Sequence, residues 1–394
     1  MSGLTVLLTN ITLASRTGTE VAIRDFARAL QARGHTPVVY SPTLGELATE
    51  IRKTTVPVVD DLGRLARAPD VIHGHHHPQT MAALLRFPGV PAVFFCHDWR
   101  AWHDAPPRHP RLRRYVPVDA TVRDRLTFEH AIPAAQVHLR PNAVDLARFA
   151  PRGPLPERPA RALLFSNYAR EDTHLVAVRE ACARMGLPLD VIGSGAGTAV
   201  TAPEAILGDY DLVFAKGRSA LEALAVGAAV VLCDFRGIGS MVTSADLDAL
   251  RLANFGTRTL QTPLAPEPLL AEIARYDPRD AAEVSRRIRA SAGLDAALDD
   301  LVALYRAVIA EQAAAGPDDL AAELAAAGSY VERWSHLFDD DAYLQRDYFR
   351  EQNAALGAEL ASMRWERDQL AAQLEANWWK FPRRTLRRWL ARRL

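Results

Sequence analysis

The chain has 394 residues, which is enough for two domains of about 150 residues with an extension and excludes a single small module. Apolar residues make up 49% of the chain and charged residues 24%, so packed cores are expected and global disorder is excluded. The 47 basic residues balance the 47 acidic ones, so the chain as a whole has no net charge that would favour a nucleic-acid partner.

The first 150 residues alternate short apolar runs with segments of helical period, such as residues 20–32. Alternation of this kind predicts a parallel sheet with helices on both sides. We therefore expect an α/β domain over residues 1–150. Its predicted strands are Leu4–Thr9, Val38–Tyr40, Val56–Val59, Val71–His73, Ala92–Cys96, Val116–Val118 and Val137–Leu139.

A proline-rich segment follows this domain. Residues 151–160 contain four prolines, too many for a helix or a central strand, and are predicted to be an interdomain linker. The alternation then restarts and predicts a second α/β domain over residues 161–316, closed by a helix at Leu294–Gln312. We expect the two domains to face each other across a hinge. The predicted strands of the second domain are Ala162–Ser166, Leu189–Ile192, Leu212–Phe214 and Ala229–Leu232.

Residues 317–377 are predicted to be a helical extension. Apolar residues recur there at heptad spacing from Phe349 to Leu374, with Asn353 and Arg367 at two core positions. This pattern fits a coiled coil that pairs two copies of the chain; a helix packed on its own domain is the alternative.

The last segment, residues 378–394, holds seven basic residues and no acidic one. It places apolar side chains on one helical face and arginines around them, which is typical of a helix that binds an anionic membrane surface. Docking on an acidic patch of the protein's own body is the alternative.

Ligands of parallel α/β sheets bind at the carboxyl ends of the strands, so the loops after the strands hold the candidate site residues. After the first strand, Thr17 and Gly18 begin a helix whose amide groups can meet a hydroxylated or anionic acceptor. A capping box made by Thr17 and Glu20 is the alternative.

Histidines gather after two further strands. His75 lies in the run His73–His77, and His97 and Asp98 follow the next strand. The spacing matches no standard zinc site, so no metal is predicted. We assign His75 to the wall of the acceptor pocket and His97, with Asp98, to catalysis as a proton carrier. Exposed loop histidines without a ligand are the alternative.

Glycines and cations mark the loops of the second domain. Lys216 and Arg218 lie where a predicted helix begins after the strand Leu212–Phe214, and they are candidates for binding a diphosphate. Glu222 lies one turn further along the same helix. A chance surface position is the alternative for Lys216, and a capping box with Ser219 is the alternative for Glu222. Gly193, Ser194 and Gly195 form a glycine-rich turn after the strand Leu189–Ile192. This turn could let the backbone approach a phosphate; a turn without a ligand is the alternative.

Two segments resemble a known family, the family-four GT-B glycosyltransferases. The family's Pro-Asn-Gly-Val-Asp…Phe segment is similar to Arg140-Pro-Asn-Ala-Val-Asp-Leu-Ala-Arg-Phe149. Its Glu-Ala-Met-Ala-x-Gly-x-Pro-Val-Val segment is similar to Leu221-Glu-Ala-Leu-Ala-Val-Gly-Ala-Ala-Val-Val231. The resemblance covers about residues 4–312 and implies an α/β fold of two facing Rossmann-like domains (GT-B), here with a helical and coiled-coil appendix.

The resemblance also implies roles. Glu222 matches the family's Glu that binds the nucleotide ribose, so the second domain is the nucleotide-sugar side and the first domain the acceptor side. The nucleoside diphosphate leaves the anomeric carbon while cations and helix N-termini neutralise its charge, so neither a metal nor a further cofactor is required. The family's phosphate clamp is matched by Arg170 alone, and Phe214 stands where the family has another Glu.

We therefore expect a glycosyltransferase that uses a nucleotide sugar and a lipid-linked or cell-surface glycan acceptor. The change at Phe214 favours, as the alternative, a catalytically degenerate scaffold that binds a partner, and a GT-B nucleotide-sugar epimerase is a third function. The N-terminus lacks a signal-peptide pattern, and the three cysteines form no disulfide framework. The expected location is the cytoplasm, with a homodimer held on the inner face of the cell membrane by its basic tails.

Overall fold

The computed structural model describes residues 3–316, 318–335 and 340–377. Its contacts divide the chain into two compact units, Met1–Ala327 and Gly328–Leu394. The first unit holds both α/β domains, so the predicted fold class, α/β with C-terminal helices, is confirmed.

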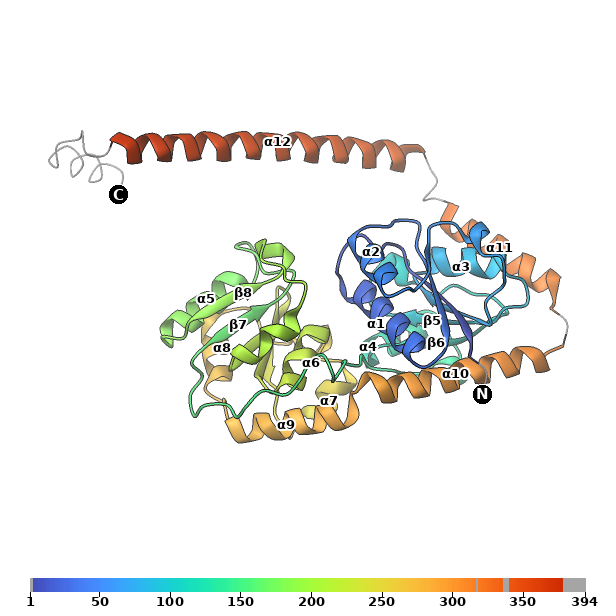
Figure 1. The fold of residues 1–394 in the computed structure, drawn as a ribbon, viewed down its shortest axis with the longest axis horizontal. Helices are drawn as coiled ribbons and strands as arrows, with labels where there is room; N and C mark the ends of the chain where they lie inside the picture. Colours follow the sequence, from blue (N-terminus) through green and yellow to red (C-terminus); the bar gives the residue numbers. More distant parts are fainter. Residues whose placement is uncertain (1–2, 317, 336–339, 378–394) are drawn as a thin grey trace. The chain divides into compact units, whose positions relative to one another are not determined.

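The first domain is built on a six-stranded sheet in the order β3-β2-β1-β4-β5-β6 (Figure 1). All of its strand pairs are parallel, and the central strands β4 and β5 are buried along their whole length, as expected for a sheet covered by helices on both faces. Its elements are β1 (Thr5–Thr9), α1 (Gly18–Ala32), β2 (Thr36–Tyr40), α2 (Glu46–Lys53), β3 (Val58–Val59), β4 (Val71–His75), α3 (His77–Arg86), β5 (Ala92–Cys96), β6 (Leu112–Pro117) and α4 (Ala120–Asp124).

The second domain has a five-stranded sheet in the order β11-β10-β9-β7-β8. Four strands are parallel, and β11 pairs antiparallel with β10 at the edge. Its elements are β7 (Ala162–Phe165), α5 (Leu175–Arg184), β8 (Leu189–Ile192), β9 (Leu212–Ala215), α6 (Gly217–Val226), β10 (Ala229–Asp234), β11 (Gly237–Met241), α7 (Leu247–Leu252), α8 (Pro266–Ile273) and α9 (Pro278–Ser291).

Two predictions about strands were wrong. Val137–Leu139 forms only an isolated bridge, between Tyr115 and Val137, although its apolar residues alternate like those of a strand. The edge strand β11 was missed because Gly237 and Gly239 lower its apparent strand propensity. The proline-rich segment 151–161 contains no helix or strand.

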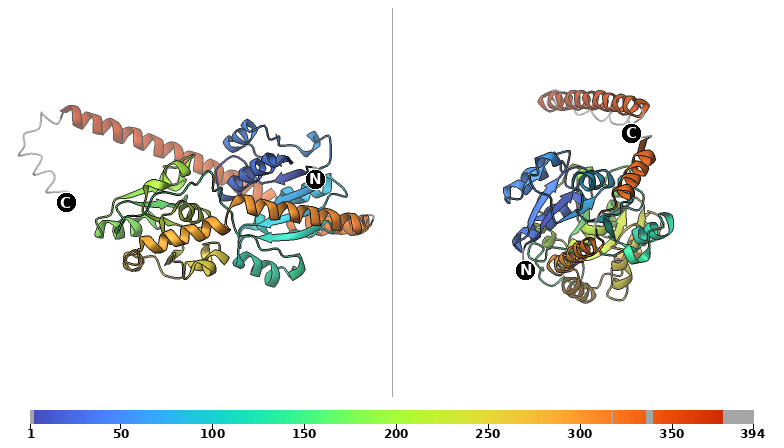
Figure 2. Two further views of the ribbon diagram at one scale, coloured as in Figure 1. Left: turned by 60° about the horizontal axis from the view of Figure 1, so that its bottom comes forward. Right: turned by 90° about the vertical axis from the view of Figure 1, so that its right-hand side faces the viewer.

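The helix that follows the second domain, α10 (Leu294–Ala314), packs on the first domain (Figures 1 and 2). Its buried residues, which include Leu301 and Tyr305, belong to the same hydrophobic core as Leu8 and Phe95. The sequence predicted that this helix closes the second domain, residues 161–316. Its apolar stripe correctly indicated a buried face, but the domain that covers this face is the first one. The chain therefore crosses between the domains a second time, and the two crossings hydrogen-bond to each other where Leu294 N–H donates to the carbonyl of Val144 at 2.8 Å.

A buried ion pair attaches the next helix, α11 (Leu320–Trp334), to the first domain. The guanidinium of Arg111 donates to both carboxylate oxygens of Glu323, at 2.7 and 3.0 Å. It also donates to the backbone carbonyls of Leu84, Phe87 and Val90. Because every side of this buried cation is satisfied, the first turns of α11 are held against the first domain.

The second compact unit contains the long helix α12 (Asp340–Asn377). Its heptad residues Leu356, Leu360, Met363 and Leu370 are all exposed. No helix in residues 3–316, 318–335 and 340–377 combines the length and apolar character needed to cross a membrane. The predicted basic tail, residues 378–394, lies outside the described residues.

The packing of α10 makes a prediction about stability. Leu301 is 1% exposed, so Leu301→Ala should leave a cavity and lower the free energy of unfolding by about 2–5 kcal/mol. The half-exposed Leu85 of α3 is the matched control, and Leu85→Ala should change stability by no more than about 0.5 kcal/mol. Urea unfolding measures the free energy of unfolding of both variants. If Leu301→Ala lowered it as little as Leu85→Ala does, α10 would not be part of the core.

Candidate functional site

Two cavities lie where loops of the two domains meet at the carboxyl ends of the strands. The larger one measures about 490 Å³, and the smaller one, about 30 Å³, shares the side chain of Arg218 with it. Of the residues predicted from the sequence, the large cavity is lined by Thr17, Gly18, Gly193, Ser194, Arg218 and Glu222. The small cavity is lined by His97 and by polar residues that the sequence analysis did not assign to the site, among them Asp25, Arg140 and Asn142.

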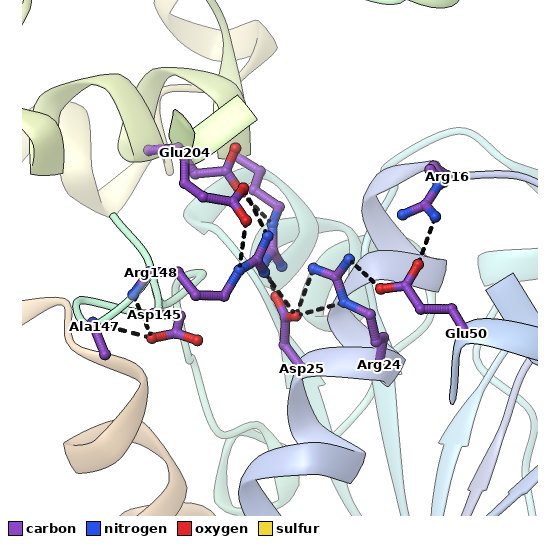
Figure 3. A network of polar contacts seen from close by, with 10 residues as sticks. Arg16, Arg24, Asp25, Glu50, Asp145, Ala147, Arg148 and Glu204 are labelled. Atoms are coloured by element: carbon purple, nitrogen blue, oxygen red, sulfur yellow. Dashed lines mark hydrogen bonds and ion pairs between the residues drawn. The ribbon is translucent and has the colours of Figure 1, made fainter. Parts of the chain in front are cut away.

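Asp25, on α1, is the centre of a network of charged side chains (Figure 3). Its Oδ1 accepts hydrogen bonds from Arg24 at 2.7 and 2.9 Å and from Arg148 at 3.4 Å, while Oδ2 pairs with Arg218 of the second domain. Burial alone would raise the pKa of Asp25, but the charges of Arg218, Arg24 and Arg148 outweigh burial and hold the pKa below its usual value. Asp25 is therefore an ionised, almost fully buried carboxylate that joins the two domains.

Arg218 divides its guanidinium between two carboxylates. Besides its pairing with Asp25, its Nε donates to Oε1 of Glu222 at 2.9 Å, one turn along α6. Burial raises the pKa of Glu222 despite this contact, and the nearby charge of Asp25 adds to the increase. Because α6 begins at Gly217 with Lys216 as its N-cap, Ser219 is not a cap residue, and the capping box considered for Ser219 and Glu222 is wrong.

The outer part of the network balances its charges. Arg148 extends between Asp25 and Glu204, and Arg24 lies between Asp25 and Glu50, which also pairs with Arg16 (Figure 3). Four guanidinium groups thus face four carboxylates in this network, counting Arg218 and Glu222. An anionic ligand entering the large cavity has to take over guanidinium groups that these carboxylates now hold.

The start of α1 is both a cap and a wall of the large cavity. Thr17 is the N-cap residue, and its N–H donates to Oε2 of Glu20 at 2.6 Å. The local capping arrangement considered in the sequence analysis is therefore present. Thr17 and Gly18 nevertheless line the cavity, so the positive end of the α1 dipole lies at its edge.

The predicted histidines lie deeper than loop residues. His75 is fully buried, and its Nδ1 lies 2.7 Å from Nε2 of His97. Burial, helped by the charge of Arg218, lowers the pKa of His97 to about 4, so the ring is neutral at pH 7. Asp98 lines neither cavity; its Oδ1 accepts the N–H groups of Arg100 and Ala101 at 2.6 and 2.7 Å and shapes its own loop.

Three side chains within the described residues lie close enough together to share a metal ion: His76, His103 and Asp104. The N–H of Ile11 donates to Nδ1 of His76 at 3.1 Å, so the proton of the neutral ring is on Nε2 and neither nitrogen has a free lone pair. This group does not fit a metal site.

Besides His75 and Asp98, four further residues named from the sequence line neither cavity. Lys216 pairs with the buried Asp234, and Arg170 pairs with Asp172 at the surface, at 3.2 Å. The position of Gly195 leaves no room for a side chain, since a Cβ there would lie 2.6 Å from the carbonyl oxygen of Asn167. Phe214 is fully buried in the core of the second domain.

Several charged residues that line the cavities were not predicted from the sequence, among them Arg148 and Asp25. Arg148 stands in the segment used for the family resemblance, so its position was available as a signal. Asp25 carried no signal, because it lies inside a predicted helix instead of a loop. Its role depends on contact with Arg218, 193 residues away in the chain.

Comparison with known proteins agrees with this geometry. Residues 16–148 match the sequence model of Glycosyltransferase Family 4. A glycosyltransferase from Rickettsia africae ESF-5 is similar in structure, with a TM-score of 0.57 and 14% identity over 78% of this chain and 99% of that one. The chain has the fold of this glycosyltransferase.

The GT-B fold is shared with a second solved structure. HepE of Anabaena, crystallised in complex with UDP and glucose, has a TM-score of 0.52 and 13% identity over 77% of this chain and 99% of that one. A comparison with curated proteins gives no match. The predicted resemblance to family-four GT-B glycosyltransferases is thus confirmed.

The Asp25 network makes a second prediction. Asp25→Ala leaves buried guanidinium groups without their carboxylate and should lower the free energy of unfolding by about 3–5 kcal/mol at pH 7. The folded-state pKa of Asp25 lies below the unfolded value of about 3.9, so this contribution is present above about pH 4 and is lost as the pH falls through the folded pKa.

Urea unfolding of Asp25→Ala at pH 7 and pH 3 measures this pH dependence. Asp172→Ala, which breaks an exposed pair, is the control and should cost no more than about 1 kcal/mol. An equal loss for Asp25→Ala at both pH values would contradict the assignment of an ionised Asp25.

Proposed function

We propose that this protein transfers a sugar from a nucleotide-sugar donor to a glycan or lipid-linked acceptor without the help of a metal ion. The observation that carries the proposal is the cavity of about 490 Å³ lined by both domains. The beginning of α1 lines it together with four arginines, so it combines a helix dipole with four cations. They are Arg16, Arg24, Arg148 and Arg218. Such groups stabilise the negative charge that develops on a departing diphosphate.

The comparisons support the same proposal. The first domain matches Glycosyltransferase Family 4, and HepE, which has the same fold, was crystallised with UDP and glucose. In the proposed complex, the diphosphate takes the place of the Asp25 carboxylate on Arg218 and Arg148. Glu222, released from Arg218, accepts hydrogen bonds from hydroxyl groups of the ribose. His97 lies at the boundary between the donor and the acceptor, in the small cavity.

One observation favours a second function, a binding scaffold without turnover. Phe214 stands where the family has a Glu, and its side chain is fully buried. It therefore offers no contact to a donor sugar. A scaffold of this kind would bind a nucleotide or a partner protein but release no product.

Calorimetric titration with UDP and UDP-glucose tests the proposal, together with an assay for released UDP. We expect binding of both compounds, and Glu222→Ala should weaken it by about 1–3 kcal/mol because charged hydrogen-bond partners are lost. Glu171→Ala, which removes the partner of the exposed Arg179 outside both cavities, is the matched control and should leave UDP binding within about twofold of wild type. Absence of binding would sink the proposed function, and binding without turnover would favour the scaffold.

We further propose that two copies pair through α12. The heptad stripe of this helix is exposed at Leu356, Leu360, Met363 and Leu370, and burying it against a second copy removes this apolar surface from water. Asn353 and Arg367, which share the stripe, favour a partner that pairs them in register.

The basic residues 378–394 are proposed to hold the protein on the inner face of the cell membrane. Seven cations near an anionic surface contribute on the order of 1 kcal/mol each, and a dimer presents two such tails. A membrane location would place the cavity near a lipid-linked acceptor.

Co-sedimentation with anionic vesicles tests the role of the tail. The full chain should pellet at low salt, whereas a chain ending at Asn377 should stay in the supernatant, because the other 377 residues carry a formal charge of −7. The same vesicles at high salt are the control, since screening weakens the attraction. Equal pelleting of both chains would show that the tail is not the anchor.

A further inference from the structure

Three imidazole rings and one phenol form a continuous hydrogen-bonded series inside the first domain. Nε2 of His73 lies 2.7 Å from Nε2 of His75, and Nδ1 of His75 lies 2.7 Å from Nε2 of His97. At the other end, Nδ1 of His73 is hydrogen-bonded to the hydroxyl of Tyr305 on α10. The series thus runs from the packed interface with α10 to the wall of the small cavity.

Packing holds the rings in one orientation. His73 and His75 are alternate residues of β4, so both project from the same face of the sheet, and their rings differ by only 4° in plane. Phe95 of the neighbouring strand lies parallel to the His73 ring, 9° apart and 4.1 Å between centroids. The His73 and His75 rings are thus parallel, with their centroids 4.7 Å apart.

All three histidines are neutral at pH 7. Burial lowers the pKa values of His73 and His75 well below their usual range, and it lowers that of His97 to about 4. Each ring therefore carries one proton, which leaves three protons for the six ring nitrogens.

The number of protons restricts the possible tautomers to two. Each of the two nitrogen–nitrogen contacts must contain one proton. Two protons in one contact would repel each other, and a contact without a proton would place two lone pairs face to face. The third proton is then on one of the outer nitrogens, Nδ1 of His73 or Nδ1 of His97. The tautomers of all three rings change together between these two arrangements.

The hydroxyl of Tyr305 selects one of these two tautomeric arrangements. Its side chain is fully buried, and His73 is its hydrogen-bond partner among the described residues. If Nδ1 of His73 carried the proton, the hydroxyl would have to accept it, and its own O–H would be left without an acceptor, which is costly for a buried donor. The hydroxyl therefore donates to His73, and the third proton is on Nδ1 of His97.

We propose that Tyr305, His73 and His75 are positioning residues that hold His97 in its Nδ1–H tautomer, so that His97 donates a hydrogen bond to an oxygen of the substrate. This inference rests on the proposed function, because it places the substrate beside His97. Nδ1 of His97 has no protein partner among the described residues, and the ring lines the cavity of about 30 Å³, which is more than the ~10–15 Å³ that one water-sized group requires. A hydroxyl or phosphoryl oxygen of the substrate fits there. In this tautomer His97 is a donor and not a base.

The tautomer can be measured directly in the free protein. In protein labelled with ¹⁵N-histidine, long-range proton–nitrogen correlation spectra at pH 7.5 should show a protonated Nδ1 and a bare Nε2 for His97, whose signals are assigned by their loss in His97→Gln. A proton on Nε2 of His97 in the wild type would overturn the inference, whatever the variants do.

Tyr305→Phe tests the role of the hydroxyl. Without the hydroxyl that donates to His73, neither tautomeric arrangement is preferred, so His97 should populate both tautomers. If the two are equally populated, the apparent affinity for UDP-glucose should fall about twofold. Tyr115→Phe is the matched control, since it removes a buried hydroxyl that donates to the carbonyl of Pro107 at 2.6 Å and should leave His97 unchanged. A single Nδ1–H tautomer in folded Tyr305→Phe would overturn the role of Tyr305.

These outcomes are separable from those of the proposed function, because the spectra need no ligand. An Nδ1–H His97 in a protein that binds no nucleotide sugar would overturn the proposed function and its substrate contact, and it would support the tautomer assignment. Binding of UDP-glucose to a protein whose His97 carries the proton on Nε2 would overturn this inference alone.

Discussion

The carboxylate of Asp25 and the guanidinium of Arg218 come from opposite domains and meet in a place from which water is largely excluded. A buried charge is tolerated only when it is paired and hydrogen-bonded, so neither group can be left alone without a large cost in free energy. This requirement fixes the start of α6 against the middle of α1. It thereby sets the distance between the two walls of the large cavity, and Arg148 and Glu222 take their positions from the same pair.

The balance of charges around Asp25 connects stability with ligand chemistry. Guanidinium groups that already hold carboxylates are preorganised for another anion with similar geometry, because bidentate contacts suit phosphate as well as carboxylate. The internal carboxylates prevent the arginines from repelling one another while the cavity holds no anion. In the proposed function, an anion with two phosphoryl groups replaces these contacts, which a neutral sugar cannot do.

Much of the fold could be predicted because it depends on local patterns. The alternation of strands and helices and the glycine turn after β8 each follow from residues next to one another in the chain. The site could be predicted only where it follows a strand, as for Thr17, His97 and Arg218. Asp25 and Tyr305 were missed because their roles arise from contacts with residues about 200 positions away. The partner of α10 was missed for a related reason, since an apolar stripe does not specify which domain covers it.

The second crossing of the chain has a mechanical consequence. The chain enters the second domain before Val144, which packs in the core of that domain, and Gly293 leads back out of it to α10 beside this first crossing. Two parallel covalent connections resist twisting and shearing of one domain against the other more than a single tether would, and they leave bending about the line through both as the easiest motion. A protease that cuts the proline-rich segment would leave the halves joined through Gly293, and in native conditions the nicked protein would migrate as one particle.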